Sequence, residues 1–235
     1  MSREIVLDTE TTGLKTQEGH RIIEIGCVEL VNRVASGKVF HAFVNPARDV
    51  PHDAFRIHGI STEFLQDKPP FASIADALLA FLEDSPIVAH NASFDFGFVN
   101  FELKKAGRPE VPQDRIIDTL RLARTKHGSG GNRLDDLCKR YGIDNSRRTK
   151  HGALLDAELL AEVYCELTGG RQSGFDLAVE AVPEAASEAL ALVPVPRDLQ
   201  TSSRLTPESA SAHRQFVEKL GPSAFWKDHL GKETA

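Results

Sequence analysis

The sequence has few cysteines, no long apolar run and no recognisable secretion signal. It has three cysteines in 235 residues, Cys27, Cys138 and Cys165, and they lie far apart in apolar segments. An odd number at such spacing argues against a disulfide framework or a zinc site and predicts reduced, buried thiols. The chain also lacks a run of about 18 apolar residues and the start of a secretion signal. We therefore expect a cytoplasmic protein with no membrane partner.

Positive charge is outnumbered by negative charge overall, with 28 Lys and Arg against 34 Asp and Glu, and it is unevenly distributed. The formal net charge is −6, yet residues 101–150 carry 13 Lys and Arg against 7 Asp and Glu. This basic middle segment either lies beside a phosphate backbone or forms ordinary solvated helix faces. Its candidates for phosphate contact are Lys104, Lys105, Arg108, Arg121, Arg124, Lys126, Lys139, Arg140, Arg147, Arg148 and Lys150.

The order of expected elements indicates an α/β fold. Segments 4–10, 21–31 and 38–46 are rich in β-branched residues and predict three antiparallel strands. Helical and strand-like segments then alternate up to Gly169, with helices expected over 73–84, 91–107, 133–141 and 151–168 and a buried strand over 86–90. We predict a mixed central sheet flanked by helices.

The composition changes after Gly169. Residues 171–206 are rich in Ala, Pro, Ser and Val and predict a flexible linker between a domain at 1–170 and a tail at 207–235. Thr206 as a cap, Pro207 and Gly221 predict a short helix in the tail. That helix has too few apolar residues for a core of its own, so its apolar side is expected to meet a partner.

Two carboxylates interrupt the apolar first strand, "IVLDTETTG" at residues 5–13. Residues i and i+2 of a strand face the same way, so Asp8 and Glu10 project together. Burying two like charges is very costly unless cations compensate them. The pair therefore predicts a metal site, and oxygen ligands favour magnesium or manganese.

Two further acids lie where a buried site would need them. Asp95 stands among Phe94, Phe96 and Phe98 in an expected helix, where Asn91 is a candidate helix cap. Asp156 lies on the helix face of Leu160 and Val163, which a sheet is expected to cover. His151, five residues before Asp156, is placed in the loop ahead of that helix, where it can act as a general base.

Three segments that carry these residues resemble the motifs of a known family. "DTETTG" at 8–13, "HNASFDFGF" at 90–98 and "HGALLDAELLAEVY" at 151–164 resemble the DEDDh 3′–5′ exonucleases, which have an RNase H-like fold. The longer stretch "RYGIDNSRRTKHGALLDAELLAEVY" and "ELTGG" resemble, within that family, the proofreading epsilon subunits of bacterial DNA polymerase III. The resemblance covers residues 3 to about 170.

The resemblance implies a two-metal mechanism on a DNA 3′ end. Asp8, Glu10, Asp95 and Asp156 would hold two Mg²⁺ or Mn²⁺ ions, and His151 would deprotonate the attacking water, which releases a 5′ monophosphate. Substrate contacts would come from Asp8, Glu10 and Asp156 and, in the "FRIHGIS" loop, from His58 and Asp53. His90, Asn91 and Phe94 are candidates for orienting the strand.

The same resemblance implies partners for the tail. "QSGFDL" at 172–177 is similar to a clamp-binding peptide, with Gln172, Phe175 and Leu177 as anchors for a sliding clamp; an arbitrary piece of linker is the alternative. Segment 207–230 resembles a stretch that binds the catalytic alpha subunit of the polymerase, through residues Phe216, Leu220, Phe225 and Trp226, with self-association as the alternative.

Two other functions stay open from the sequence. An RNA 3′-end trimming exoribonuclease has the same five catalytic residues, although it has no need of the linker and tail. A non-catalytic adaptor between clamp and polymerase would need the tail but not the intact carboxylates.

Overall fold

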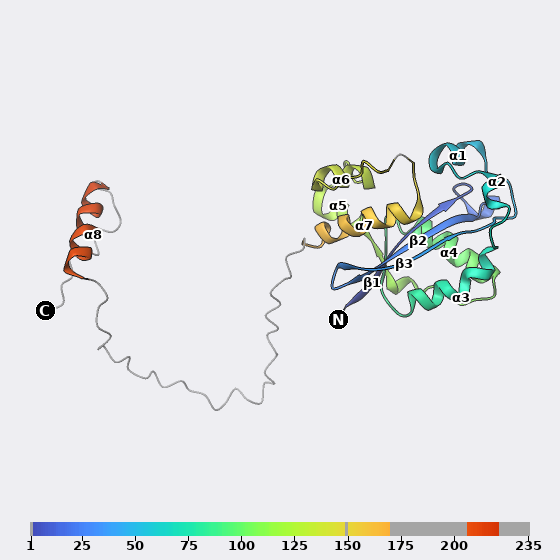
Figure 1. The fold of residues 1–235 in the computed structure, drawn as a ribbon, viewed down its shortest axis with the longest axis horizontal. Coiled ribbons are helices and arrows are strands. Elements are labelled where there is room, and N and C mark those ends of the chain that lie inside the picture. The colour runs from blue at the N-terminus through green and yellow to red at the C-terminus, as the bar shows by residue number, and fades with distance from the viewer. Residues whose placement is uncertain (1, 149, 170–205, 221–235) are drawn as a thin grey trace, which may run out of the picture. The chain divides into compact units, whose positions relative to one another are not determined.

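The computed structural model describes residues 2–148, 150–169 and 206–220, which belong to two units (Figure 1). The first two ranges form the first unit, and residues 206–220 belong to the second. The predicted linker up to residue 205 lies outside the described residues. So do the five anchor residues Gln172, Phe175, Leu177, Phe225 and Trp226.

Five strands form one mixed sheet in the first unit, in the order β3-β2-β1-β4-β5. β2 runs antiparallel to β1 and β3, whereas β4 runs parallel to β1 and β5. The predicted antiparallel start and mixed sheet are therefore confirmed. The strands are β1 (Arg3–Thr11), β2 (Ile22–Val31), β3 (Val34–Phe43), β4 (Ile87–Ala89) and β5 (Ile116–Asp118).

Helices cover both faces of this sheet (Figure 1). α3 and α4 pack on one face, and α7 packs on the other, with α5 and α6 packed against α7. The helices of the first unit are α1 (His52–His58), α2 (Thr62–Leu65), α3 (Phe71–Leu82), α4 (Ser93–Lys105), α5 (Thr119–His127), α6 (Leu134–Tyr141) and α7 (Ala153–Leu167).

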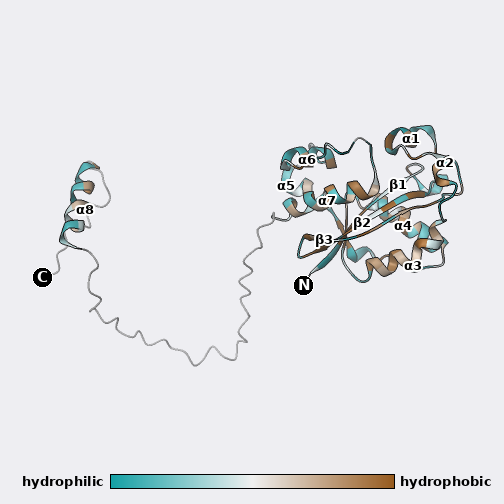
Figure 2. Ribbon diagram, in the orientation of Figure 1, coloured by the Kyte–Doolittle hydropathy of each residue, from teal (hydrophilic) through white to brown (hydrophobic). Residues whose placement is uncertain are grey.

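Alternation along β1 decides which face each of its side chains meets. Ile5 and Leu7 are fully buried in the core under α3 and α4, whereas Val6 is buried in the core under α7. Because the period of a strand is two, Asp8 and Glu10 follow Val6 toward α7. Figure 2 shows the hydrophobic residues concentrated along the central strands and α3, with more hydrophilic residues on α6.

Most of the predicted element boundaries are close to those of the structure, with three corrections. β3 begins at Val34, earlier than predicted, because Asn32 and Arg33 form a two-residue turn with positive φ angles of 52° and 65°. α3 covers 71–82 instead of 73–84. Asn91 is not the cap of α4: the cap position is Ala92, and Asn91 itself adopts a positive φ of 63°.

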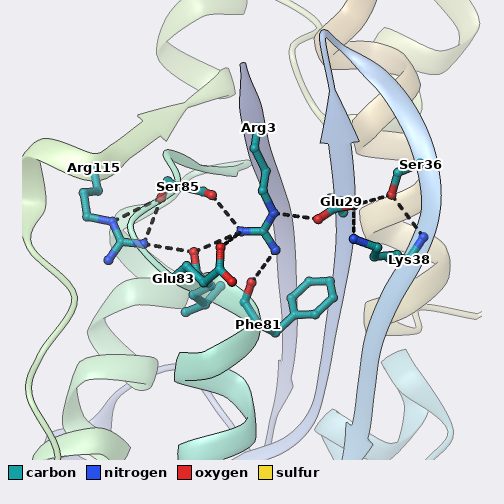
Figure 3. Close-up of polar contacts among 9 residues, drawn as sticks. Arg3, Glu29, Ser36, Lys38, Phe81, Glu83, Ser85 and Arg115 are labelled. Carbon is teal, nitrogen blue, oxygen red and sulfur yellow. Dashed lines mark hydrogen bonds and ion pairs between the residues drawn. The ribbon is translucent and has the colours of Figure 1, made fainter. Parts of the chain in front are cut away.

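The start of β1 is tied to its surroundings by a cluster of polar contacts (Figure 3). Arg3 donates hydrogen bonds to Glu29 at 2.6 Å, to Ser85 Oγ at 2.7 Å and to the Phe81 carbonyl at 2.7 Å. Ser36 donates to the other oxygen of Glu29 at 2.6 Å. The cluster therefore joins β1 and β2 to the C-terminal end of α3, whose last carbonyls need donors.

The described part of the second unit is α8 (Pro207–Lys219), which Thr206 caps through its side chain. Val217 is buried, whereas Phe216 and Leu220 are 60% and 49% exposed. The predicted start of the tail helix is thus confirmed. Among the described residues, no helix is long and apolar enough to cross a membrane. The three cysteines are all described, and they are buried and form no disulfide.

Candidate active site

The four predicted carboxylates meet at one cleft of about 790 Å³. Asp8 and Glu10 reach it from the end of β1, Asp95 from the first turn of α4 and Asp156 from the first turn of α7. His151 lies on the rim, two residues before α7 begins, where the sequence predicts it. One part of the helix prediction is wrong: Leu160 faces the sheet, but Val163 packs with α5 and α6.

A glycine in β2 allows Asp156 to come this close. Gly26 is paired with Asp8 across the two strands. A Cβ atom at Gly26 would overlap the backbone of Ala153 and Leu154 at the start of α7. The missing side chain therefore lets the first turn of α7 rest on the sheet beside Asp8. The motifs did not identify Gly26, and an isolated glycine in a strand is the signal that points to such an approach.

Asp95 is held by a residue of the same strand that carries Asp8 and Glu10. Its Oδ1 accepts hydrogen bonds from the Thr9 backbone N–H at 3.1 Å and from Thr9 Oγ1 at 2.7 Å. Thr9 points to the opposite face from its two neighbours, toward α4. The "DTE" triplet thus places two acids on one face of β1 and, on the other face, a threonine that holds Asp95 by hydrogen bonds.

The electrostatics of the site show an excess of negative charge. Burial, together with the charges of Asp95, Glu10 and Asp156, raises the pKa of Asp8 well above its ordinary value. Burial and the neighbouring acids raise the pKa of Glu10 to about 8, and burial raises that of Asp95 to about 7. Such a group of carboxylates is stable in its ionised form only if cations are bound among them.

One buried arginine supplies part of the missing charge. Arg148 donates to both oxygens of Asp156, at 2.5 and 2.7 Å, and to Asp135 of α6 at 2.8 Å. Burial alone would raise the pKa of Asp156, but the hydrogen bonds from His151 and Arg148 bring it below the ordinary value. Sequence reasoning included Arg148 only as one of eleven basic residues.

The histidine and two of the acids are close enough to share one ion. Ligand atoms of Glu10, His151 and Asp156 lie within 4.8 Å of one another. His151 Nδ1 is 2.7 Å from Arg148 Nη2 and 3.4 Å from Asp156 Oδ2. With four carboxylates around the cleft, the donor set is one that hard divalent ions prefer. The residues therefore fit the predicted metal site.

The two predicted substrate contacts outside the carboxylates differ in their surroundings. His58, at the end of α1, is buried, and among the described residues its Nε2 has no hydrogen-bond partner. Burial and the charges of His151 and Lys150 lower its pKa to about 4. The backbone N–H of His151 donates to the Ile57 carbonyl at 3.3 Å, which ties the loop before α7 to α1. Asp53 is exposed and pairs with Arg56 at 3.2 Å.

The remaining candidates are divided between the cleft and the outer surface. His90, Asn91 and Phe94 line the cleft. Of the eleven basic residues singled out, Arg124 and Arg148 line it as well, whereas Arg108 pairs with Asp76 and Lys126 donates to the Glu166 carbonyl. The basic middle segment is therefore only partly a feature of the site.

Comparison with known sequences places this site in a family. The family model described as "Exonuclease" matches residues 5–164, which include all five predicted catalytic residues. DNA polymerase III subunit epsilon of Rickettsia felis is 48% identical over 224 residues, with 93% of this chain and 96% of that protein covered. The Escherichia coli epsilon subunit is 43% identical over 244 residues, with 97% and 98% covered.

Solved structures show the same fold. Exonuclease X in complex with 5′ overhanging duplex DNA is 26% identical, with a TM-score of 0.55 over 70% of this chain and 90% of that chain. The nuclease domain of 3′hExo, a DEDDh family member bound to rAMP, is 15% identical, with a TM-score of 0.62 over 71% and 92%. The first unit therefore has the predicted RNase H-like exonuclease fold.

Proposed function

The chain belongs to the family of DNA polymerase III epsilon subunits, which are 3′–5′ exonucleases, and from this premise we propose how its own residues carry out proofreading. The enzyme removes mispaired nucleotides from DNA 3′ ends as part of the replicase, in the cytoplasm. The observation that carries the assignment of the active site is the meeting of Asp8, Glu10, Asp95, Asp156 and His151 at one cleft.

The exonuclease family uses divalent metal ions, and the proposed ligands are the four carboxylates. We assign two ions, Mg²⁺ or Mn²⁺, because four acids, with Arg148 as the one arginine paired to any of them among the described residues, have more negative charge than one ion neutralises. When bound, such ions activate water and stabilise the charge on the phosphate. Asp95, fixed by Thr9, and Asp156, fixed by Arg148, keep the ligand geometry constant.

His151 is the proposed general base. Its Nδ1 accepts a hydrogen bond from Arg148 Nη2 at 2.7 Å, because a guanidinium can only donate, and it lies 3.4 Å from Asp156 Oδ2. The ring nitrogen that accepts in this contact is the one that can take the proton of the attacking water. His151 is half exposed on the rim of the cleft, so the water and the phosphodiester can reach it. His58 and Asp53, on the neighbouring helix α1, are the proposed contacts of the terminal nucleotide, together with Asp8, Glu10 and Asp156.

The tail is the proposed polymerase-binding segment. Phe216 on α8 and Leu220 at its C-cap are exposed and support this role, because a monomeric helix gains nothing from exposing both. The alpha subunit is the proposed partner of residues 207–235, including Phe225 and Trp226. The sliding clamp is the proposed partner of Gln172, Phe175 and Leu177, in the linker between the nuclease domain at 1–170 and the tail.

The decisive experiment compares three substrates. A primer with a mismatched 3′ end, the matched primer and RNA of the same sequence are each digested by the wild-type chain and by Asp8→Ala, with Mg²⁺ and with chelator. We expect metal-dependent release of 5′ monophosphates, fastest from the mismatched DNA, and no release by Asp8→Ala. Faster digestion of RNA than of DNA would instead support the RNA-trimming alternative.

A further inference from the structure

The cleft has a second wall that the proposed chemistry does not use. Besides the carboxylates, it is lined by Leu120 and Arg124 of α5 and by Ser129, Gly131, Asn132 and Arg133, which lead into α6. This wall contains two arginines, Arg124 and Arg133, and both are exposed. Neither forms an ion pair with any of the described residues.

The third arginine that lines the cleft, Arg148, already has partners within the protein. Arg148 contacts Asp135, His151 and Asp156, and its side chain is only 8% exposed. The acids nearest to the second wall are also engaged: Asp135 accepts from Arg148, and Asp136 accepts the backbone N–H of Arg133 at 3.3 Å. Arg124 and Arg133 are therefore the cations of the cleft that are available to an anion from solution.

The backbone of this wall allows a ligand to come close. Gly131 adopts a positive φ of 63°, a conformation that side chains rarely allow, and it lines the cleft beside Asn132. The side-chain N–H of Asn132 donates to the Gly128 carbonyl at 2.7 Å, which holds the loop in place. A small residue in a fixed loop, between two arginines, suits the close passage of a sugar–phosphate chain.

We propose that Arg124 and Arg133 bind the phosphates of the DNA strand that leads to the scissile bond. The proposal rests on the proposed function, since it takes the carboxylates as the place of cleavage and His58 and Asp53 as the side of the terminal nucleotide. The strand then leaves the carboxylates along residues 128–133 and α5. Its binding is electrostatic and independent of sequence, as a proofreading enzyme requires.

The test separates binding of the strand from the chemistry of cleavage. The doubly substituted Arg124→Gln, Arg133→Gln chain is compared with wild type on a 12-nucleotide single strand and on the p-nitrophenyl ester of thymidine 5′-monophosphate, which has one phosphodiester and no upstream strand. We expect the ratio of kcat/KM for DNA to kcat/KM for the ester to fall at least tenfold. The dependence of log KM on log salt should also become shallower by about 1.4, from about 0.7 per phosphate contact.

The matched control is Arg121→Gln, Lys139→Gln, which removes two exposed cations from α5 and α6 outside the cleft. It should leave the ratio and the salt dependence within twofold of wild type. An equal ratio in wild type and the Arg124, Arg133 variant, or an equal fall in the control, would overturn the proposal. If wild type cleaves the ester but no DNA, the proposed function fails instead.

Discussion

The buried carboxylates at the two ends of strand β1 have opposite surroundings. At its start, Arg3 pairs with Glu29, and Ser36 and Lys38 also contact that carboxylate. At its end, Asp8 and Glu10 face Asp95 and Asp156, with Arg148 as the nearby arginine. Hydrogen bonds from Ser36 and Arg3 lower the pKa of Glu29 to about 2, whereas burial and neighbouring acids raise that of Glu10 to about 8.

This contrast separates charge that stabilises the fold from charge that is kept for catalysis. The Arg3 cluster (Figure 3) is complete within the protein and needs nothing from solution. The carboxylate cluster is incomplete and remains costly until divalent ions enter it. Substitutions at the first end should therefore change stability, and substitutions at the second should change activity.

The largest effect should come from removing a carboxylate at the catalytic end. Asp8→Asn should lower kcat by about a thousandfold, because ion binding contributes several kcal/mol of transition-state stabilisation. Glu29→Gln is the control from the other end: its kcat should stay within twofold of wild type while its melting temperature falls. Steady-state kinetics on a single strand and thermal unfolding measure both. A comparable loss of kcat in the two variants would contradict the assignment of the start of β1 to stability and of its end to catalysis.

Arg3→Ala should have the next largest effect, this time on stability. Removing Arg3 leaves the buried Glu29 carboxylate with weaker partners and frees the carbonyls at the end of α3. We expect the free energy of unfolding to fall by about 3 kcal/mol. Urea denaturation measures it, and the activity per folded molecule should not change. A fall below 0.5 kcal/mol, the range of an ordinary surface substitution, would contradict the role given to the cluster.

Arg148→Gln should reduce activity by about 10- to 100-fold, because Asp156 and His151 lose the group that orients them. Arg148→Lys keeps the charge without the bidentate geometry, so its activity should lie between that of wild type and that of Arg148→Gln. The measurement is kcat together with Mn²⁺ affinity from titration calorimetry. A kcat equal to wild type in Arg148→Gln would show that Arg148 does not position the site.

The smallest effect is a gain in stability. A raised pKa means that the folded state binds a proton more tightly than the unfolded state, so the metal-free protein should lose stability as pH rises from about 4.5 toward about 8. Glu10→Gln removes this loss and should stabilise the metal-free protein by about 2 kcal/mol at pH 8. Unfolding curves at pH 5 and 8 with chelator test the sign. A variant less stable than wild type at pH 8 would contradict it.

For Glu29 the sign is the reverse. Its lowered pKa stabilises the fold above the ordinary carboxyl range, and this contribution is lost as pH falls from about 4.5 toward about 2. The two ends of β1 should therefore be distinguishable in one pH series of unfolding curves.

The sequence by itself determined the fold class and the acids of the site. Period-two alternation placed Asp8 and Glu10 on one side of β1, and the helices expected over 91–107 and 133–141 end within two residues of those bounds, at Lys105 and Tyr141. Local rules succeed there because the spacing of side chains on a strand or helix needs no knowledge of the partner. The linker and tail boundaries remain predictions.

Only the tertiary structure decided which residues surround those acids. Gly26, Thr9 and Arg148 act on the site through contacts with residues that are distant along the chain or on other elements. An isolated glycine in a strand indicates a close approach but not its partner, and no local pattern distinguishes Thr9 or Arg148. The same holds for Arg124, which is one of many exposed arginines until the fold brings it into the cleft that the carboxylates line. Charge balance is a property of the assembled cluster, because it depends on which groups packing brings within a few ångströms of one another.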